Sequence, residues 1–183
     1  MLPDLPFDIV VLIIDIVGEN EDTNLLKELS LVSHFFLQIC RKHIFATVKL
    51  RGAVPGFYNI ASSKKGFVEL LKSRPDVVKY IRKLAYKVSL NDDEDVDLLS
   101  PIPFLPTFSR LNCLSITSNS PRDWNKLDSS LTSAFLHLMH IPTINHIDLS
   151  FIQNFPLSCL TPSVNLHRLD IFYLLELKKD SSP

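Results

Sequence analysis

The chain opens with an almost unbroken run of apolar residues, LPFDIVVLIIDIV, from Leu5 to Val17. The run predicts a helix, because Pro6 suits the first helical turn and Gly18, followed by Glu19 and Asn20, is typical of a helix end. Apolar side chains cover most of this helix, with Ile9, Leu12, Ile13 and Ile16 on one face and Val10, Val11, Ile14 and Val17 around the rest. A helix of this kind must be covered on more than one side.

Two further short helices are predicted after this run. Thr23 or Asn24 caps the first of them, whose apolar stripe comprises Leu25 or Leu26, Leu29 and Val32. Ser33 caps a third helix from His34 to Ala46, and Val48 to Leu50 are predicted to be extended. Three short helices bury only a modest core. The first helix therefore needs cover from the rest of the chain or from another protein.

The second half of the chain repeats a short phrase of the form apolar-x-x-apolar-x-apolar. Its copies are IRKLAY from Ile81, LNCLSI from Leu111, INHIDL from Ile144 and LHRLDI from Leu166. The alternation at the end of each copy is typical of a short strand with one buried face. A helical stripe from Leu127 to Met139 separates the second and third copies. This order predicts an irregular solenoid of the leucine-rich-repeat kind, and an ordinary α/β domain with a parallel sheet is the alternative.

The patterns together predict a mixed α/β protein in three parts. Residues 1–50 form a small three-helix unit, 51–75 a loop and a connecting helix, and 76–183 the repeat region. In the connecting helix Phe67, Leu70 and Leu71 share a face, and Pro75 ends it. A solenoid needs a polar cap over its last repeat, whereas residues 171–175 are apolar, so we expect a shortened or incomplete chain.

The opening run does not fit a targeting or membrane segment. A signal peptide needs basic residues before its apolar core, but no lysine or arginine precedes Lys27, and Asp4, Asp8 and Asp15 flank or interrupt the run. The run is also shorter than the roughly 18 to 20 residues that span a bilayer. Secretion and a membrane association are therefore both disfavoured.

Composition narrows the function classes. The chain has 19 basic and 20 acidic residues and a net charge of −1, which disfavours nucleic acid as a partner. Its four glycines form neither a GxGxxG motif nor a P-loop, which disfavours a nucleotide cofactor. Cys40, Cys113 and Cys159 are far apart and odd in number, which predicts free thiols in a reducing compartment, the cytoplasm or nucleus.

Several residues are candidates for metal binding or catalysis. His137, His140 and His146 have no glutamate that would complete an HExxH metal motif, and structural histidines are favoured. The acidic run from Asp92 to Asp97 lacks the glycine and terminal glutamate of a calcium loop, and a solvated loop is favoured. No GxSxG elbow supports a hydrolase using Ser, His and Asp. We therefore expect no enzyme activity, no metal and no cofactor.

The first fifty residues nevertheless contain a pattern that resembles a known motif. LPFDIVVLIID, followed by LLKELSLVSHFFLQICRKHIFATVKL, resembles the F-box, and more narrowly the F-box of large families in mushroom-forming fungi. The position often held by tryptophan is Phe36 here. The segments DWNKLDSSL and INHIDLSFIQNFPLS resemble the divergent leucine-rich repeats that follow the F-box in the same families.

The resemblance implies a function without chemistry. F-box motifs bind the Skp-type adaptor of cullin-RING ubiquitin ligases, and the repeats of such proteins hold an unknown target protein near the ligase. The adaptor-binding residues implied by the resemblance are Leu5, Pro6, Ile9, Ile13, Leu29, Val32 and Phe36. The alternative is a repeat-type binding scaffold outside the ubiquitin system, with the first helix packed against the chain's own repeats.

Overall fold

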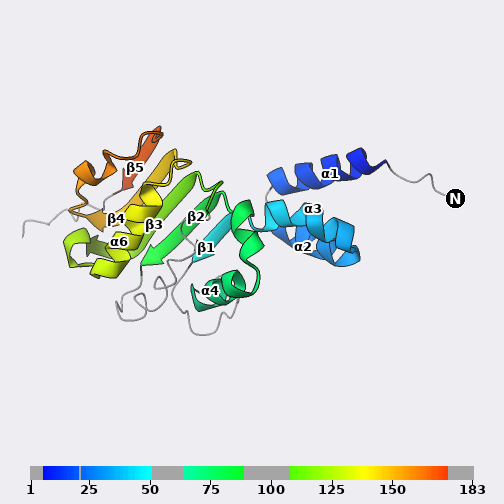
Figure 1. Cartoon of the computed structure of the whole chain (residues 1–183), viewed down its shortest axis with the longest axis horizontal. Coiled ribbons are helices and arrows are strands. Elements are labelled where there is room, and N and C mark those ends of the chain that lie inside the picture. The colour runs from blue at the N-terminus through cyan, green and yellow to red at the C-terminus, as the bar shows by residue number, and fades with distance from the viewer. Residues whose placement is uncertain (1–5, 21, 51–63, 89–107, 173–183) are drawn as a thin grey trace, which may run out of the picture.

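The protein is described by a computed structural model that places residues 6–20, 22–50, 64–88 and 108–172. The first three helices lie at one end, and the sheet, with the later helices beside it, forms the other (Figure 1). The helices are α1 (Phe7–Glu19), α2 (Thr23–Val32), α3 (His34–Ile44), α4 (Lys64–Ser73) and α6 (Ser129–Met139), with short 3-10 helices η2 (Pro75–Tyr80), η4 (Trp124–Lys126) and η5 (Leu157–Leu160). The strands are β1 (Thr47–Leu50), β2 (Lys83–Val88), β3 (Cys113–Asp123), β4 (His146–Gln153) and β5 (Arg168–Phe172).

The helices form where the sequence predicts them, with small differences at their ends. Helix α1 begins directly after Pro6. The cap of α2 is Asp22, not Thr23 or Asn24 as predicted, because its carboxylate accepts the amide of Leu25 at 3.1 Å. Ser33 caps α3 as predicted, but the helix ends at Ile44 rather than at Ala46 because the chain turns there into β1. No described helix has the length and apolar character that crossing a bilayer requires.

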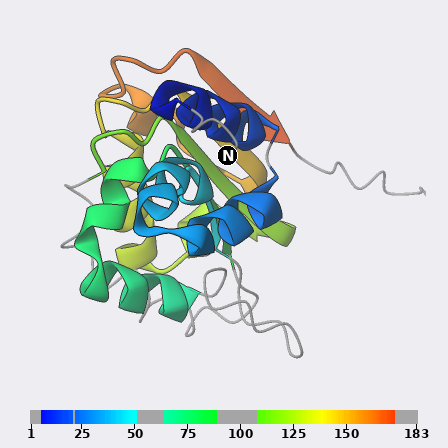
Figure 2. The same ribbon diagram turned by 90° about the vertical axis from the view of Figure 1, so that its right-hand side faces the viewer.

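The three N-terminal helices bury a very small core. Only Ile14, Leu26 and Cys40 are fully buried there, one from each helix, and further apolar side chains pack partly buried around them. Helices α2 and α3 lie as a pair and α1 lies along one side of them (Figure 2). Arg41 on α3 lies 3.7 Å from Asp76 on η2, which links this helical unit to the sheet.

The sheet contains five parallel strands in sequence order, β1-β2-β3-β4-β5. Equivalent positions of the repeated phrase lie side by side in it, as Leu84, Leu114, Ile147 and Leu169 do. The strands begin two residues later than the phrase. Its first apolar residue precedes each strand, and at Ile81, Leu111 and Ile144 that residue is fully buried.

The same main-chain contact recurs between successive strands. The carbonyl of Ala46 accepts the amides of Arg82 and Lys83, and the carbonyl of Arg82 accepts the amides of Asn112 and Cys113 in the same way. The carbonyls of Asn112 and Asn145 repeat this contact with the two strands that follow. Each step of the sheet is therefore built like the one before.

Strand β1 is a further copy of the phrase, which the sequence analysis missed. Phe45, Val48 and Leu50 have the same spacing, and Val48 pairs with Leu84 as the other copies pair with one another. From the sequence alone, residues 45–50 belong to the end of the helical unit, because no loop separates them from the preceding helix. The parallel sheet therefore includes β1, which comes from residues 1–50 of the sequence.

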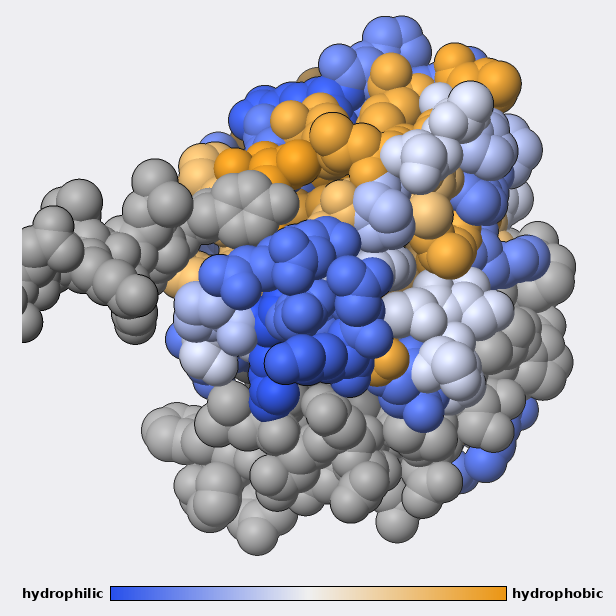
Figure 3. All heavy atoms as spheres, turned by 90° about the vertical axis from the view of Figure 1, so that its left-hand side faces the viewer, coloured by the Kyte–Doolittle hydropathy of each residue, from blue (hydrophilic) through white to orange (hydrophobic). Residues whose placement is uncertain are grey.

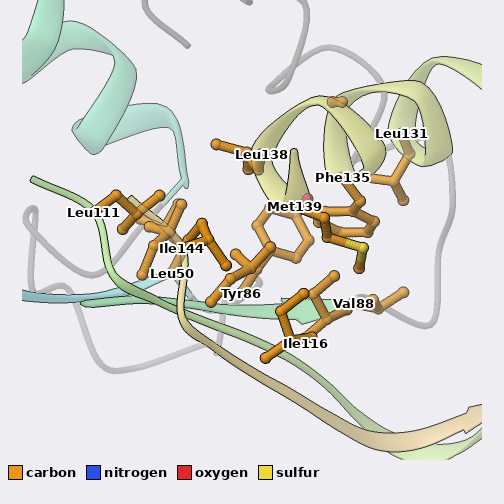
Figure 4. Close-up of a cluster of buried hydrophobic side chains, with 14 of the residues drawn as sticks. Leu50, Tyr86, Val88, Leu111, Ile116, Leu131, Phe135, Leu138, Met139 and Ile144 are labelled. Carbon is orange, nitrogen blue, oxygen red and sulfur yellow. The ribbon is translucent and has the colours of Figure 1, made fainter. Parts of the chain in front are cut away.

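One face of the sheet carries the main core. Phe135 on α6 packs edge-on against Tyr86 on β2, with ring centroids 5.1 Å apart (Figure 4). The ring centroid of Trp124 lies 6.1 Å from that of Phe135 and 4.8 Å from that of Phe155. Helix α4 adds Phe67 and Leu71, on the face that its sequence predicts. The mixed α/β class is therefore confirmed, with helices of the described chain on one face of a parallel sheet.

Candidate protein-interaction surfaces

Helix α1 has two apolar faces, one buried and one exposed. Val10, Ile14 and Val17 turn inward onto the small core of the helical unit. The opposite side chains stay in contact with solvent, since Ile9 is 42% exposed, Leu12 55%, Ile13 46% and Ile16 50%. Scattered exposed apolar residues are ordinary, but a contiguous apolar face marks an interaction site. We call these four residues and Phe7, which is 59% exposed, the α1 surface.

Phe7, at the start of α1, turns toward α3, and further exposed apolar side chains lie at the junction of α2 and α3. The ring of Phe7 lies 4.8 Å from that of Phe35, at the start of α3. Leu31 and Val32, at the end of α2, are 86% and 68% exposed. Side chains of this size at such exposure leave a large apolar area in water at the end of the molecule that lies away from the sheet.

The predicted adaptor-binding residues divide into three groups. Leu5 lies outside the described residues. The second group is exposed and comprises Pro6, Ile9, Ile13 and Val32. The third group, Leu29 and Phe36, is partly buried against the small core. The set implied by the resemblance does not include Phe7, Leu12, Ile16, Leu31 and Phe35, which are also exposed. Helical spacing alone places Leu12 and Ile16 beside Ile9 and Ile13, so this signal was available in the sequence.

A polar cluster holds α1 against α3 at its C-terminal end. Asp15 Oδ1 accepts hydrogen bonds from Lys42 Nζ at 2.6 Å and from His43 Nε2 at 2.8 Å. The bond from Lys42 lowers the pKa of Asp15 most, and it outweighs the opposing effect of partial burial. Gly18 lies directly against the His43 ring, where a Cβ atom would overlap it.

The second surface is the sheet face opposite α4 and α6, which we call the open face. Its side chains form rows across the strands, and the middle row is Lys49, Ala85, Ser115, Asp148 and Asp170. All the described side chains of this face are exposed or half-buried. They are mainly polar, so a ligand on this face would be recognised through hydrogen bonds and charge.

A hydrogen-bonded chain crosses the open face from β3 to β5. His146 Nε2 donates to Asp170 Oδ2 at 3.0 Å, which leaves Nδ1 to accept the thiol of Cys113 at 3.5 Å. Burial raises the pKa of this thiol, so it stays protonated at neutral pH. Burial also raises the pKa of Asp170, but the hydrogen bonds from His146 and Arg168 outweigh it and leave that pKa below its ordinary value. The chain ties three strands together, and the burial that raises the pKa of the thiol disfavours its thiolate form.

The histidines weighed as metal ligands do not converge. His137 is exposed on α6, His140 Nε2 donates to the carbonyl of Cys159 at 2.8 Å, and His146 belongs to the chain above. Among the placed residues, no group of three or more His, Cys, Asp or Glu side chains is arranged to hold a metal ion. The acidic run 92–97 lies outside the described residues.

A cleft of about 720 Å³ separates the helical unit from the sheet. Its walls come from the C-terminal ends of α1 and α3, the start of α2, the strand β1 and helix α4. The ionisable groups in its lining are Lys27, Lys42, His43, Lys49, Arg82 and Lys83, opposed by Asp15 and Glu19. Cationic side chains therefore predominate in it.

An apolar area also lies at the β5 end of the sheet, next to a hydrophilic one (Figure 3). Leu157, Val164 and Phe172 are 58%, 84% and 61% exposed there. These residues lie at the opposite end of the sheet from the helical unit, and they provide matched positions for testing the α1 surface.

Comparison with known proteins adds no relative to this picture. No protein-family model matches the chain, and no curated protein or solved structure matches it either.

Proposed function

We propose that the chain is a substrate-recognition subunit of a Skp–cullin–F-box ubiquitin ligase. In this proposal the helical unit is an F-box that binds the Skp-type adaptor, and the sheet with its helices is a short leucine-rich-repeat region that binds a target protein. The chain performs no chemistry and acts by bringing the target near the catalytic subunits of the ligase.

The observation that carries the proposal is the exposed α1 surface. A three-helix unit that buries only Ile14, Leu26 and Cys40 leaves the outer face of its first helix uncovered. Burial of an apolar side chain of this size stabilises a complex by roughly 1.5–3 kcal/mol where water is fully excluded. A partner that covers this face would therefore bind through the hydrophobic effect.

The repeat part of the proposal is supported by the regular step of the sheet. Five parallel strands in sequence order, each joined to the next by the same pair of main-chain bonds, are what a solenoid requires. The open face then corresponds to a binding surface in which every repeat adds one side chain to each row.

The alternative, a scaffold whose first helix packs on its own repeats, needs a covered α1 surface. The side chains that it would bury are instead 42–59% exposed. In the described part of the chain, helix α1 packs closely on α2 and α3. The adaptor proposal accounts for the exposed face, and the scaffold alternative does not.

The test is co-expression with a fungal Skp-type adaptor carrying an affinity tag. We expect stoichiometric capture of the wild-type chain and loss of capture for the Ile9→Asp/Ile13→Asp variant, because two carboxylates would have to be buried at the interface. The matched control is Leu157→Asp/Val164→Asp, which places the same charges on the apolar β5 end and should be captured like wild type. A folded, monomeric wild-type chain that is not captured would contradict the proposal.

A further inference from the structure

Strand β1 lies at one edge of the sheet, and no described strand pairs with its outer side. The carbonyl of Ala46 is bonded to β2, and in a parallel ladder alternate residues face the same neighbour. The amides and carbonyls of Thr47 and Lys49 therefore point away from the sheet. Within the described residues, no hydrogen bond reaches these groups. An edge of this kind is a template for an added strand.

This edge forms one wall of the cleft between the helical unit and the sheet. Both Thr47 and Lys49 line the cleft, together with side chains from each face of the sheet. A strand spans about 3.3 Å per residue, so the four residues of β1 would pair with a peptide segment of about four to six residues.

The two faces of the sheet give the cleft two different chemistries. On the open face, Lys49 is exposed, and Lys83 lies beside it at the position that pairs with Thr47. On the core face, Val48 and Phe67 line the cleft. Because side chains of a strand alternate between faces, a peptide added to β1 would meet cations with one set of side chains and apolar groups with the other.

The charges of the cleft favour an anion. Lys27, Lys49, Arg82 and Lys83 form no salt bridge within the described part of the chain, while Lys42 and His43 are already paired with Asp15. Glu19 is the remaining acidic group in the lining. The unpaired cations therefore exceed the unpaired acids.

A short acidic peptide suits these charges better than a long polyanion. The open face becomes acidic at Asp148 on β4 and Asp170 on β5, which would repel a nucleic acid running across the strands. Lysine side chains act as separate point charges, whereas the bidentate recognition typical of phosphate favours arginine. Separate carboxylates at alternate positions match the separate cations.

We propose that an extended peptide with alternating acidic and apolar residues binds as an added strand on the free edge of β1. Its main chain pairs with Thr47 and Lys49, its carboxylates face Lys49 and Lys83, and its apolar side chains face Val48 and Phe67. The inference rests on the proposed function only in assigning this peptide to the target protein. Binding itself is independent of the adaptor.

The probe is a fluorescein-labelled peptide of about nine residues that alternates Glu and Val, titrated with the full chain and followed by fluorescence anisotropy. We expect saturable binding that weakens with salt. The Lys49→Gln/Lys83→Gln variant should lose about tenfold or more in affinity. Its matched control, Lys87→Gln/Lys126→Gln, removes the same charge from positions outside the cleft lining and should stay within about twofold of wild type.

A second pair of variants isolates the main-chain contact. Lys49→Pro and Lys49→Gln remove the same charge, but only proline also removes the main-chain N–H that points to the free edge. Proline is tolerated at this position because that N–H makes no hydrogen bond within the sheet. We expect Lys49→Pro to bind several-fold more weakly than Lys49→Gln while melting at a similar temperature.

Three results would overturn the inference. The first is that a peptide in which Pro replaces each Val binds as tightly as the Glu/Val peptide. The second is that Lys49→Pro and Lys49→Gln bind the peptide with equal affinity. The third is that a single-stranded oligonucleotide of the same charge displaces the peptide at equal concentration. Adaptor capture of Lys49→Gln/Lys83→Gln should match wild type, so a failure of peptide binding is distinguishable from a failure of the proposed function.

Discussion

The imidazole of His43 lies 2.8 Å from the carboxylate of Asp15, and this contact joins the last turn of α3 to the middle of α1. Lys42 binds the same carboxylate oxygen at 2.6 Å. Helix α1 buries only one face, and this polar cluster adds directional contacts with α3 to the apolar packing there. The orientation of the α1 surface therefore depends on it.

Gly18→Ala should loosen α1. The added methyl group would overlap the His43 ring, which must move and so release Asp15. Overpacking of this kind destabilises by about 1–3 kcal/mol. Thermal unfolding followed by circular dichroism, with adaptor capture as a second readout, measures the effect. Glu19→Ala, at an exposed neighbouring position, is the control, and equal melting temperatures for the two variants would contradict the structure.

Acid should weaken the same contact. The pKa of Asp15 is below its ordinary value of 3.8 in the folded chain, so its contribution to stability is fully present above that value and is lost as the pH falls through the lower, folded value. The melting temperatures of wild type and Asp15→Asn should therefore differ at about pH 6 and approach one another as the pH falls below 3.8. Asp8→Asn, on the exposed first turn of α1, should follow wild type throughout. A difference that persists in acid would show that the charge of Asp15 is unimportant.

Neighbouring isoleucines of α1 should respond oppositely to truncation. Ile14 is 1% exposed and Ile13 is 46% exposed. Ile14→Ala should destabilise the helical unit by about 2–5 kcal/mol, whereas Ile13→Ala should change its stability little. Alkylation of Cys40 is a local measure, because this thiol is fully buried and burial raises its pKa. Ile14→Ala should accelerate Cys40 alkylation, and comparable rates in the two variants would contradict the assignment of the two faces.

Truncation of Phe135 should unfold the repeated region first. Its ring is fully buried between α6 and the sheet, in contact with Tyr86 and Trp124. Phe135→Ala should destabilise by about 3–5 kcal/mol. Trp124 is the one tryptophan of the sequence, so its fluorescence reports this region directly. The control His137→Ala, on the exposed side of α6, should unfold at the same denaturant concentration as wild type. An unfolding midpoint of Phe135→Ala equal to that of wild type would contradict this packing.

Local signals predicted most of the elements, because they depend on residues close in sequence. The cap Ser33 precedes α3, and Pro75 follows α4. The alternation in LAY, LSI, IDL and LDI predicted four strands. The strand β1 was missed as a repeat because no connecting segment separates it from α3, and its partner β2 lies more than thirty residues away.

The candidate sites were predictable only in part. Helical spacing placed Ile9 and Ile13 on one face of α1 but could not choose between that face and the one containing Ile14, since both are apolar. The chain formed by Cys113, His146 and Asp170 joins residues that are 24 to 33 positions apart. Nothing in the local sequence at any of them indicates the other two.

The sequence by itself determined the helices, the repeated strand phrase and the excess of apolar surface on α1, because periodicity and capping act within a few residues. The tertiary structure decided which face of α1 stays exposed, that β1 is the first strand of the sheet, and that a cationic cleft borders its free edge. These features depend on the register of strands and on the packing of helices brought together from distant parts of the chain. That packing is set by the fit of whole buried faces, which no local pattern contains.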